Sequence, residues 1–324
     1  MKPPNPSATL ALLMLATTSL AAATLSPACE ATNRQALSVL ADQQVAEAEA
    51  QLTQFVSQMI STNDTLCLAV TLSSLTSVYE RAGRLDLAEH SASRAMNLLA
   101  QTVPSNSPVW RPPLLLLAKL AIERGQFSKA TTLLSRVELL PEPTHVDQAL
   151  MEGLKAILLV EAGSLAQAES AYQRSIAERD LAGQRATNDI APELCNLAVL
   201  YLKENRASEA LPLLERALRI EDNSRYDPDA HVKTLLDLAV AHARTKSSKE
   251  ANSYFLRAID ILDTLPPTLR PDIGRNVYLF YSSFLRETGR KREAKALDKE
   301  AYARFGPDPS TMTVGINSLL AKDR

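Results

Sequence analysis

The sequence predicts an all-α chain made of about six copies of one helix–turn–helix unit. Glycine accounts for only 9 of 324 residues and aromatic residues for 5%, which argues against a strand-rich fold with many turns. The apolar pattern of residues 196–220, NLAVLYLKENRASEALPLLERALRI, returns at residues 237–261 as DLAVAHARTKSSKEANSYFLRAIDI. Each segment contains two helical stripes separated by a polar break, which indicates two helices joined by a short turn.

The N-terminus predicts a signal peptide over residues 1–23. One lysine is followed by the apolar run from Leu10 to Leu20 and then by three alanines, a suitable site for signal peptidase. We therefore expect an exported protein, periplasmic or secreted. Two alternatives remain, a retained membrane anchor and a lipoprotein acylated at Cys29, although Ser26 stands where a lipobox has leucine. No later segment has 18 uncharged apolar residues.

Residues 30–66 are predicted to form N-terminal capping helices. Their Ala48 lies 40 residues before Ala88, so they are alternatively a degenerate seventh unit. The three cysteines, Cys29, Cys67 and Cys195, contain no CxxC pair and predict neither a zinc site nor a disulfide framework, although export would permit a disulfide.

Residues 67–305 are predicted to form the repeat array. One small residue recurs in each second helix at intervals of 38 to 43 residues, namely Ala88, Ala130, Ala168, Ala210, Ala251 and Ala294. Such alanines let paired helices approach closely, and a larger side chain would overpack the contact. Four of the glycines fall in the breaks within pairs, at Gly83, Gly125, Gly163 and Gly289, where a left-handed backbone ends the first helix. Residues 306–324 follow as a C-terminal tail.

These segments resemble tetratricopeptide repeats, and their unit of about 41 residues is similar to the repeats of the kinesin light chain type. The resemblance implies a right-handed α-α superhelix whose concave groove, lined by first helices, binds a peptide or a helix of a partner protein. It places the peptide-binding positions at Ser73, Ser77, Leu115, Lys119, Asn196, Val199, Lys203, Leu236, Val240, Arg244, Leu279 and Ser283. Members that hold a C-terminal carboxylate use a Lys/Asn/Arg clamp. The equivalent residues here, mostly Leu, Val, Ser and Cys, favour a partly apolar ligand instead.

The charge pattern offers no nucleic-acid footprint. The net charge is −2, from 35 basic and 37 acidic residues, and no run of like charge suggests a basic membrane face. One arginine recurs in each second helix, at Arg94, Arg136, Arg174, Arg216 and Arg257. We interpret this row as a solvated outer face whose guanidiniums bond nearby carboxylates or carbonyls.

No catalytic, cofactor or metal motif is present, so we expect no enzyme activity, no cofactor and no metal. The four histidines show no metal-ligand spacing, and GxSxG, GxxxxGK[ST] and GxGxxG are absent. His242 is expected to pack within its helix. His231, near Asp229 and Asp237, is the best acid–base candidate, but no nucleophile stands near it in the sequence.

Three hypotheses of function follow. The first is an exported protein–protein interaction scaffold, with self-association as a variant. The second is an envelope-assembly component tethered to the membrane through a retained N-terminus or an acylated Cys29. The third is an enzyme with an unrecognised site.

Overall fold

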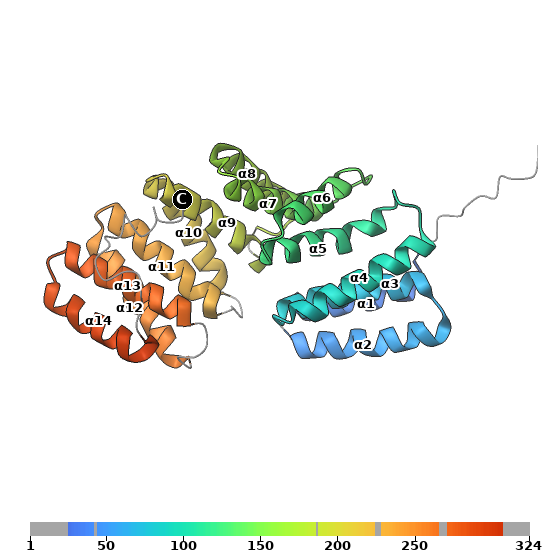
Figure 1. The fold of residues 1–324 in the computed structure, drawn as a ribbon, viewed down its shortest axis with the longest axis horizontal. Coiled ribbons are helices and arrows are strands. Elements are labelled where there is room, and N and C mark those ends of the chain that lie inside the picture. Colours follow the sequence, from blue (N-terminus) through green and yellow to red (C-terminus); the bar gives the residue numbers. More distant parts are fainter. Residues whose placement is uncertain (1–24, 42–43, 186, 224–227, 266–270, 307–324) are drawn as a thin grey trace, which may run out of the picture. The chain divides into compact units, whose positions relative to one another are not determined.

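The structure, a computed structural model, describes residues 25–41, 44–185, 187–223, 228–265 and 271–306. The predicted signal peptide and nearly all of the predicted tail lie outside these residues. Every regular element in the described part is helical, which confirms the predicted all-α class (Figure 1). None of the described helices is both long and apolar enough to cross a membrane.

The helices follow one another with short turns inside each pair. The α-helices are α1 Pro27–Ala41, α2 Val45–Thr62, α3 Thr65–Arg81, α4 Leu85–Thr102, α5 Arg111–Glu123, α6 Phe127–Glu138, α7 His145–Glu161, α8 Leu165–Leu181, α9 Ala191–Lys203, α10 Ala207–Asp222, α11 Pro228–Arg244, α12 Ser248–Thr264, α13 Pro271–Glu287 and α14 Lys291–Phe305. Two 3-10 turns, Pro108–Trp110 and Asn188–Ile190, lead into α5 and α9. The residues predicted to cap the array form a helix pair of their own, α1 and α2.

The chain divides into two compact units. Unit 1 comprises Met1–Leu120 and Ser135–Pro141, and unit 2 comprises Ala121–Leu134 and Glu142–Arg324. Helices α5 and α6 each contribute residues to both units.

In unit 1, α1 packs on α2 and α3 around a small apolar cluster that includes Leu40, Leu52 and Val78. A disulfide joins Cys29, in the first turn of α1, to Cys67 in α3, and both residues are buried. The expectation that the cysteines form no framework is therefore wrong for this pair. Its two members stand 38 residues apart, and only the packing of α1 on α3 brings them together.

In unit 2, the pairs α7–α8, α9–α10, α11–α12 and α13–α14 stack in chain order. Each second helix contacts the first helix of the next pair, and α11 also contacts α9 and α13. Leucines and aromatic residues such as Leu214, Leu238 and Phe255 make one continuous core through these pairs. Continuous burial is needed because a single helix pair cannot cover its own apolar face.

The repeated small residues lie at fully buried positions of the second helices. All six second-helix alanines, and Ala48 in α2, have no exposed surface. The glycines of the breaks have the expected left-handed backbone, with φ of +70° at Gly83 and +74° at Gly163. The two pairs without glycine use Asn205 (φ 62°) and Lys246 (φ 63°) at this place. A left-handed backbone is slightly unfavourable for a residue with a Cβ atom, and the packing of the helix pair offsets this cost.

The row of second-helix arginines is largely paired, as interpreted from the sequence. Arg174 lies 2.6 Å from Glu152, Arg216 lies 2.6 Å from Asp180, and Arg257 lies 3.5 Å from Asp222. Arg136 instead stacks over the Trp110 ring. Four of the five guanidiniums of the row are thus engaged inside the chain, which favours a structural role over binding of a polyanion.

Ala210→Phe should destabilise the array far more than Arg216→Ala. The phenyl ring has no space at a fully buried helix contact, so we expect a loss of about 3 kcal/mol in the free energy of unfolding. Arg216→Ala removes a partly exposed ion pair and a 2.9 Å bond to the Arg185 carbonyl, worth about 1 kcal/mol. Urea titrations of both variants test this, and equal losses would contradict the helix-pair register.

Candidate peptide-binding face

The candidate face is the side of unit 2 formed by the first helices α9, α11 and α13, here called the first-helix face. Contacts between α9 and α11, and between α11 and α13, make it continuous. Eight of the predicted positions lie on these helices. Asn196 is exposed, Val199, Lys203, Leu236, Arg244 and Leu279 are half-buried, and Val240 and Ser283 are buried. The accessible members therefore combine aliphatic surface with an amide and two cations.

The other four predicted positions belong to unit 1. Ser73 is buried and its hydroxyl donates to the Ala69 carbonyl at 3.0 Å, and Leu115 is also buried. Ser77 is half-buried, and the Lys119 ammonium donates to Glu80 at 2.8 Å. These side chains serve packing and an ion pair within unit 1.

Arg244, at the end of α11, presents a cation whose described partners are all neutral. One guanidinium nitrogen donates to the Leu202 carbonyl and also lies 3.4 Å from the side-chain oxygen of Asn205. Burial lowers the pKa of Arg244 without a carboxylate to oppose it. The group borders a hollow of about 400 Å³ lined by Asn205, Ala207, Ser208 and Thr245. Such a cation is well suited to an acidic side chain or a carbonyl of a ligand.

Asp237 stands on α11 one repeat after Asn196. Although part of the residue is exposed, packed atoms surround its carboxylate, and this burial raises its pKa to about 7; Lys233 opposes the shift and Glu221 adds to it. Around neutral pH the group is therefore partly protonated, and its charge on the first-helix face varies with pH.

Asp237→Asn should change the pH dependence of stability. Because the pKa is raised from its ordinary value of 3.8, the wild type gains stability at acid pH and loses it as pH rises to about 7. We expect the Asn variant to match the wild type near pH 4 and to exceed it by about 1–2 kcal/mol at pH 8, a value reduced for solvent screening. Urea titrations at the two pH values measure this. A constant difference would show that Asp237 keeps an ordinary pKa.

The acid–base candidate His231 is built into the helix contact. Its ring nitrogens lie 3.2 Å from Glu221 and 3.6 Å from Asp222, and only 2% of the residue is exposed. Cys195 packs nearby with its sulfur 3.3 Å from the Thr234 hydroxyl, and burial raises the pKa of its thiol to about 12. A thiol with this pKa stays protonated and is a poor nucleophile at neutral pH. His242 stacks on Tyr254, as expected of a packing residue.

The described residues contain no group of three His, Cys, Asp or Glu side chains that could hold a metal ion.

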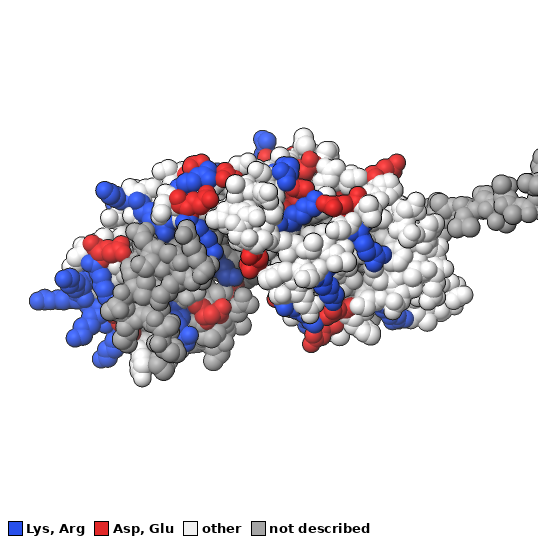
Figure 2. Space-filling model, turned by 45° about the horizontal axis from the view of Figure 1, so that its top comes forward, with Lys and Arg blue, Asp and Glu red and all other residues white. Residues whose placement is uncertain are grey.

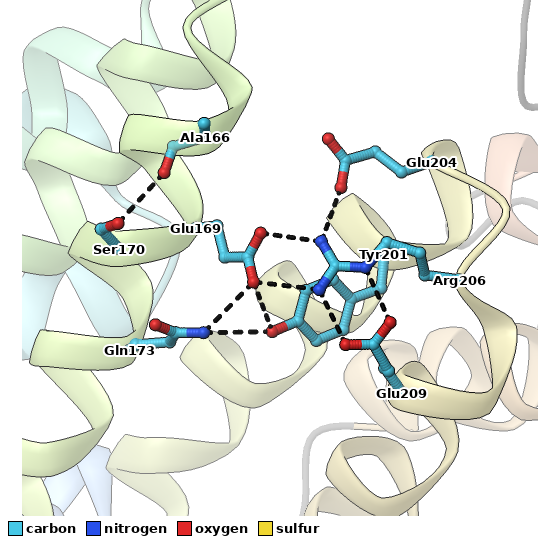
Figure 3. A network of polar contacts seen from close by, with 8 residues as sticks. All are labelled: Ala166, Glu169, Ser170, Gln173, Tyr201, Glu204, Arg206 and Glu209. Atoms are coloured by element: carbon cyan, nitrogen blue, oxygen red, sulfur yellow. Dashed lines mark hydrogen bonds and ion pairs between the residues drawn. The ribbon is translucent and has the colours of Figure 1, made fainter.

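A set of arginines that the sequence did not single out links successive pairs. Figure 3 shows the clearest case, Arg206, which directly precedes α10. Its guanidinium bonds both carboxylate oxygens of Glu169 (2.8 and 3.1 Å), contacts Glu204 and Glu209, and lies over the Tyr201 ring at 4.1 Å. The hydrogen bond from Arg206 lowers the pKa of Glu169.

The same place is taken by Arg84 before α4 and by Arg290 before α14, which bond Glu49 and Asn252 of the preceding second helices. The sequence contains a pattern that could have identified these arginines. A tyrosine stands five residues before Arg84 and Arg206 and nine residues before Arg290. These side chains fix the spacing of neighbouring pairs, so their role is structural.

A tetratricopeptide repeat family model matches residues 190–264, which span α9 to α12. No curated protein sequence matches the chain. The tetratricopeptide repeats recognised in the sequence are confirmed by this match together with the helix-pair geometry.

Solved structures agree on the fold. BtubC from P. vanneervenii is 20% identical with a TM-score of 0.52, over 69% of this chain and 91% of that one. The Cut9–Hcn1 hetero-tetramer of the APC/C gives 15% identity and a TM-score of 0.62, over 88% of this chain and 47% of that one. A Rap protein complexed with Competence and Sporulation Factor gives 13% identity and a TM-score of 0.56, over 90% of this chain and 75% of that one. At these identities the likeness concerns the fold alone.

Proposed function

We propose that the protein is an exported interaction scaffold that binds a peptide or helix of a partner protein on the first-helix face of unit 2. The observation that carries the proposal is the make-up of this face, which combines half-buried aliphatic side chains with the exposed amide of Asn196 and the Arg244 cation. Aliphatic area supplies affinity, while a few polar groups fix the register of a bound segment. The Rap complex and the Cut9–Hcn1 assembly support the proposal by analogy of fold.

Export is supported by the disulfide between Cys29 and Cys67. Disulfides persist in oxidising compartments such as the periplasm and the extracellular space, and they are rare in the cytosol. If residues 1–23 are removed as proposed, Cys29 becomes the sixth residue of the mature chain. Sequencing the N-terminus of protein recovered from the extracytoplasmic fraction tests this, and an intact Met1 in that fraction would contradict cleavage.

The tethered alternative is weakened on the same ground. A lipoprotein carries its lipid on the cysteine sulfur, and the Cys29 sulfur is bonded to Cys67. Acylation of Cys29 is therefore incompatible with the disulfide. A tether would require the apolar N-terminal segment itself to be retained.

Peptide binding can be mapped by photo-cross-linking. A photoreactive amino acid at position 196 stands on the first-helix face, and one at position 219 stands at an exposed site of the second helix α10. Incubation with an array of amphipathic peptides should give cross-links from position 196 only. Equal labelling from position 219 would contradict a binding role for the first-helix face.

Arg244→Ala provides a second readout with the peptide so identified. We expect at least a tenfold loss of affinity for a peptide with an acidic residue and little change for its neutral counterpart. Calorimetry measures both, and circular dichroism of the variant confirms that it is folded.

A further inference from the structure

One face of α14 is basic along its whole length. At 100° per residue, Lys291, Arg292, Lys295, Lys299 and Tyr302 fall within an arc of about 100°. All five are exposed, and 57% of Tyr302 is accessible to solvent. None of the four cations has an ion-pair partner among the described residues. We call these five residues the basic stripe.

The acidic residues of α14 are engaged elsewhere. Glu293 pairs with Arg290 at 2.6 Å, Asp298 accepts bonds from Ser282 and Arg286, and Glu300 accepts from the Tyr278 hydroxyl at 2.9 Å. These partners come from α13 and the turn before α14, so these three carboxylates bond residues outside the stripe. Lys and Arg side chains accordingly gather at the end of unit 2 where α13 and α14 lie, at the left edge of Figure 2. The basic stripe is not evident from the sequence, because acidic and basic residues are mixed in the segment KREAKALDKEA.

We propose that the basic stripe of α14 docks on a membrane surface rich in anionic phospholipid headgroups. Three of its four cations are lysines, which act as point charges and suit a diffuse anionic surface better than the bidentate recognition of one carboxylate. Tyr302 lies within the arc of the cations and combines an apolar ring with a polar hydroxyl, a side chain favoured at the membrane–water interface.

The geometry of the stripe agrees with a flat surface. From Lys291 to Tyr302 the helix advances about 16 Å, enough to lie across several headgroups. Leu297 and Ala294, in the middle of α14, pack into the unit 2 core, whereas the five residues of the stripe stay exposed. The proposal does not depend on peptide binding by the first-helix face.

Vesicle flotation with residues 24–324, in low salt, tests the proposal. We expect binding to vesicles of phosphatidylglycerol and phosphatidylethanolamine, none to phosphatidylcholine, and loss in 0.5 M NaCl, where the screening length is about 4 Å. The double variant K295E/K299E should bind at least about 25-fold more weakly, since each cation near an anionic surface contributes about fivefold.

The matched control is K246E/K249E, which makes the same charge change in the turn before α12 and in the first turn of that helix. It should bind like the wild type. Equal loss in both variants would overturn the proposal, because net charge rather than the stripe would then govern binding.

Two further outcomes are decisive. With Tyr302→Trp, contact with the bilayer should shift the fluorescence of the new indole to the blue, whereas Trp110 is already buried in unit 1. An unshifted spectrum on bound vesicles would overturn the assignment to α14.

Polyglutamate at equal charge concentration should compete for the stripe less strongly than the anionic lipid does. Equal competition would assign the stripe to an acidic protein partner and overturn the lipid proposal.

Discussion

Replacing Arg179 with alanine should lower the free energy of unfolding by about 3–5 kcal/mol. The Arg179 guanidinium bonds Oε1 of Glu193 through Nε (3.1 Å) and Nη2 (2.9 Å), and Gln184 through Nη1 (2.9 Å). Both charged residues are only 7% exposed, so the pair joins α8 to α9 out of contact with bulk water. Removing the cation leaves a carboxylate buried without a counter-charge, and this penalty is larger than the net worth of the intact pair.

The matched control is Arg174→Ala on the same helix. Arg174 pairs with Glu152 at 2.6 Å, but 58% of its side chain is exposed, so the expected loss is below about 1 kcal/mol. Urea titrations at pH 7 compare the two variants. If Arg179→Ala and Arg174→Ala lowered the free energy of unfolding equally, burial of the Arg179–Glu193 pair would not increase its contribution to stability.

The deficit of Arg179→Ala should also depend on pH. Burial already raises the pKa of Glu193 against the opposing effect of Arg179, and without Arg179 the pKa rises further. A raised pKa in the folded state gives stability that is present at acid pH and lost as pH increases. We therefore expect a smaller deficit at pH 5 than at pH 8. Adding Glu193→Gln to Arg179→Ala should recover part of the loss and remove this pH dependence.

The helix pairs were predictable from the sequence because their determinants are local. A buried alanine such as Ala210 is required by one helix contact, and a left-handed glycine such as Gly163 is required by one turn. Because every unit contains the same contact and the same turn, these residues recur at the repeat interval. The exceptions follow the same logic. Asn205 and Lys246 adopt the conformation that glycine has elsewhere, and the surrounding periodicity still marks the break.

The polar links between pairs could not be predicted in the same way. Arg206 meets Glu169 across 37 residues and Arg179 meets Glu193 across 14, so each pairing depends on how two helices are placed. The candidate face has the same limit. Sequence register assigns Val240 and Ser283 to equivalent positions on successive first helices, yet both are buried, because accessibility depends on neighbouring helices as well as on register.

Replacing Cys29 and Cys67 with serine should destabilise unit 1 by about 4 kcal/mol. The bond closes a loop of 38 residues, and the loss of chain entropy in the unfolded state alone accounts for about this value. The consequence is local, because the apolar cluster that holds α1 on α2 and α3 is small. Hydrogen exchange should therefore show α1 opening before unit 2 is affected.

The control for the disulfide is Cys195→Ser, since the serine hydroxyl can keep the contact that the Cys195 sulfur makes with Thr234 at 3.3 Å. It should cost less than about 1 kcal/mol, and reducing agent should lower the stability of this variant as much as that of the wild type. Reducing agent should have no effect on the Cys29 and Cys67 double variant. If it left the wild type unchanged as well, the two thiols would not be joined in solution, and the support for export that rests on their bond would be lost with it.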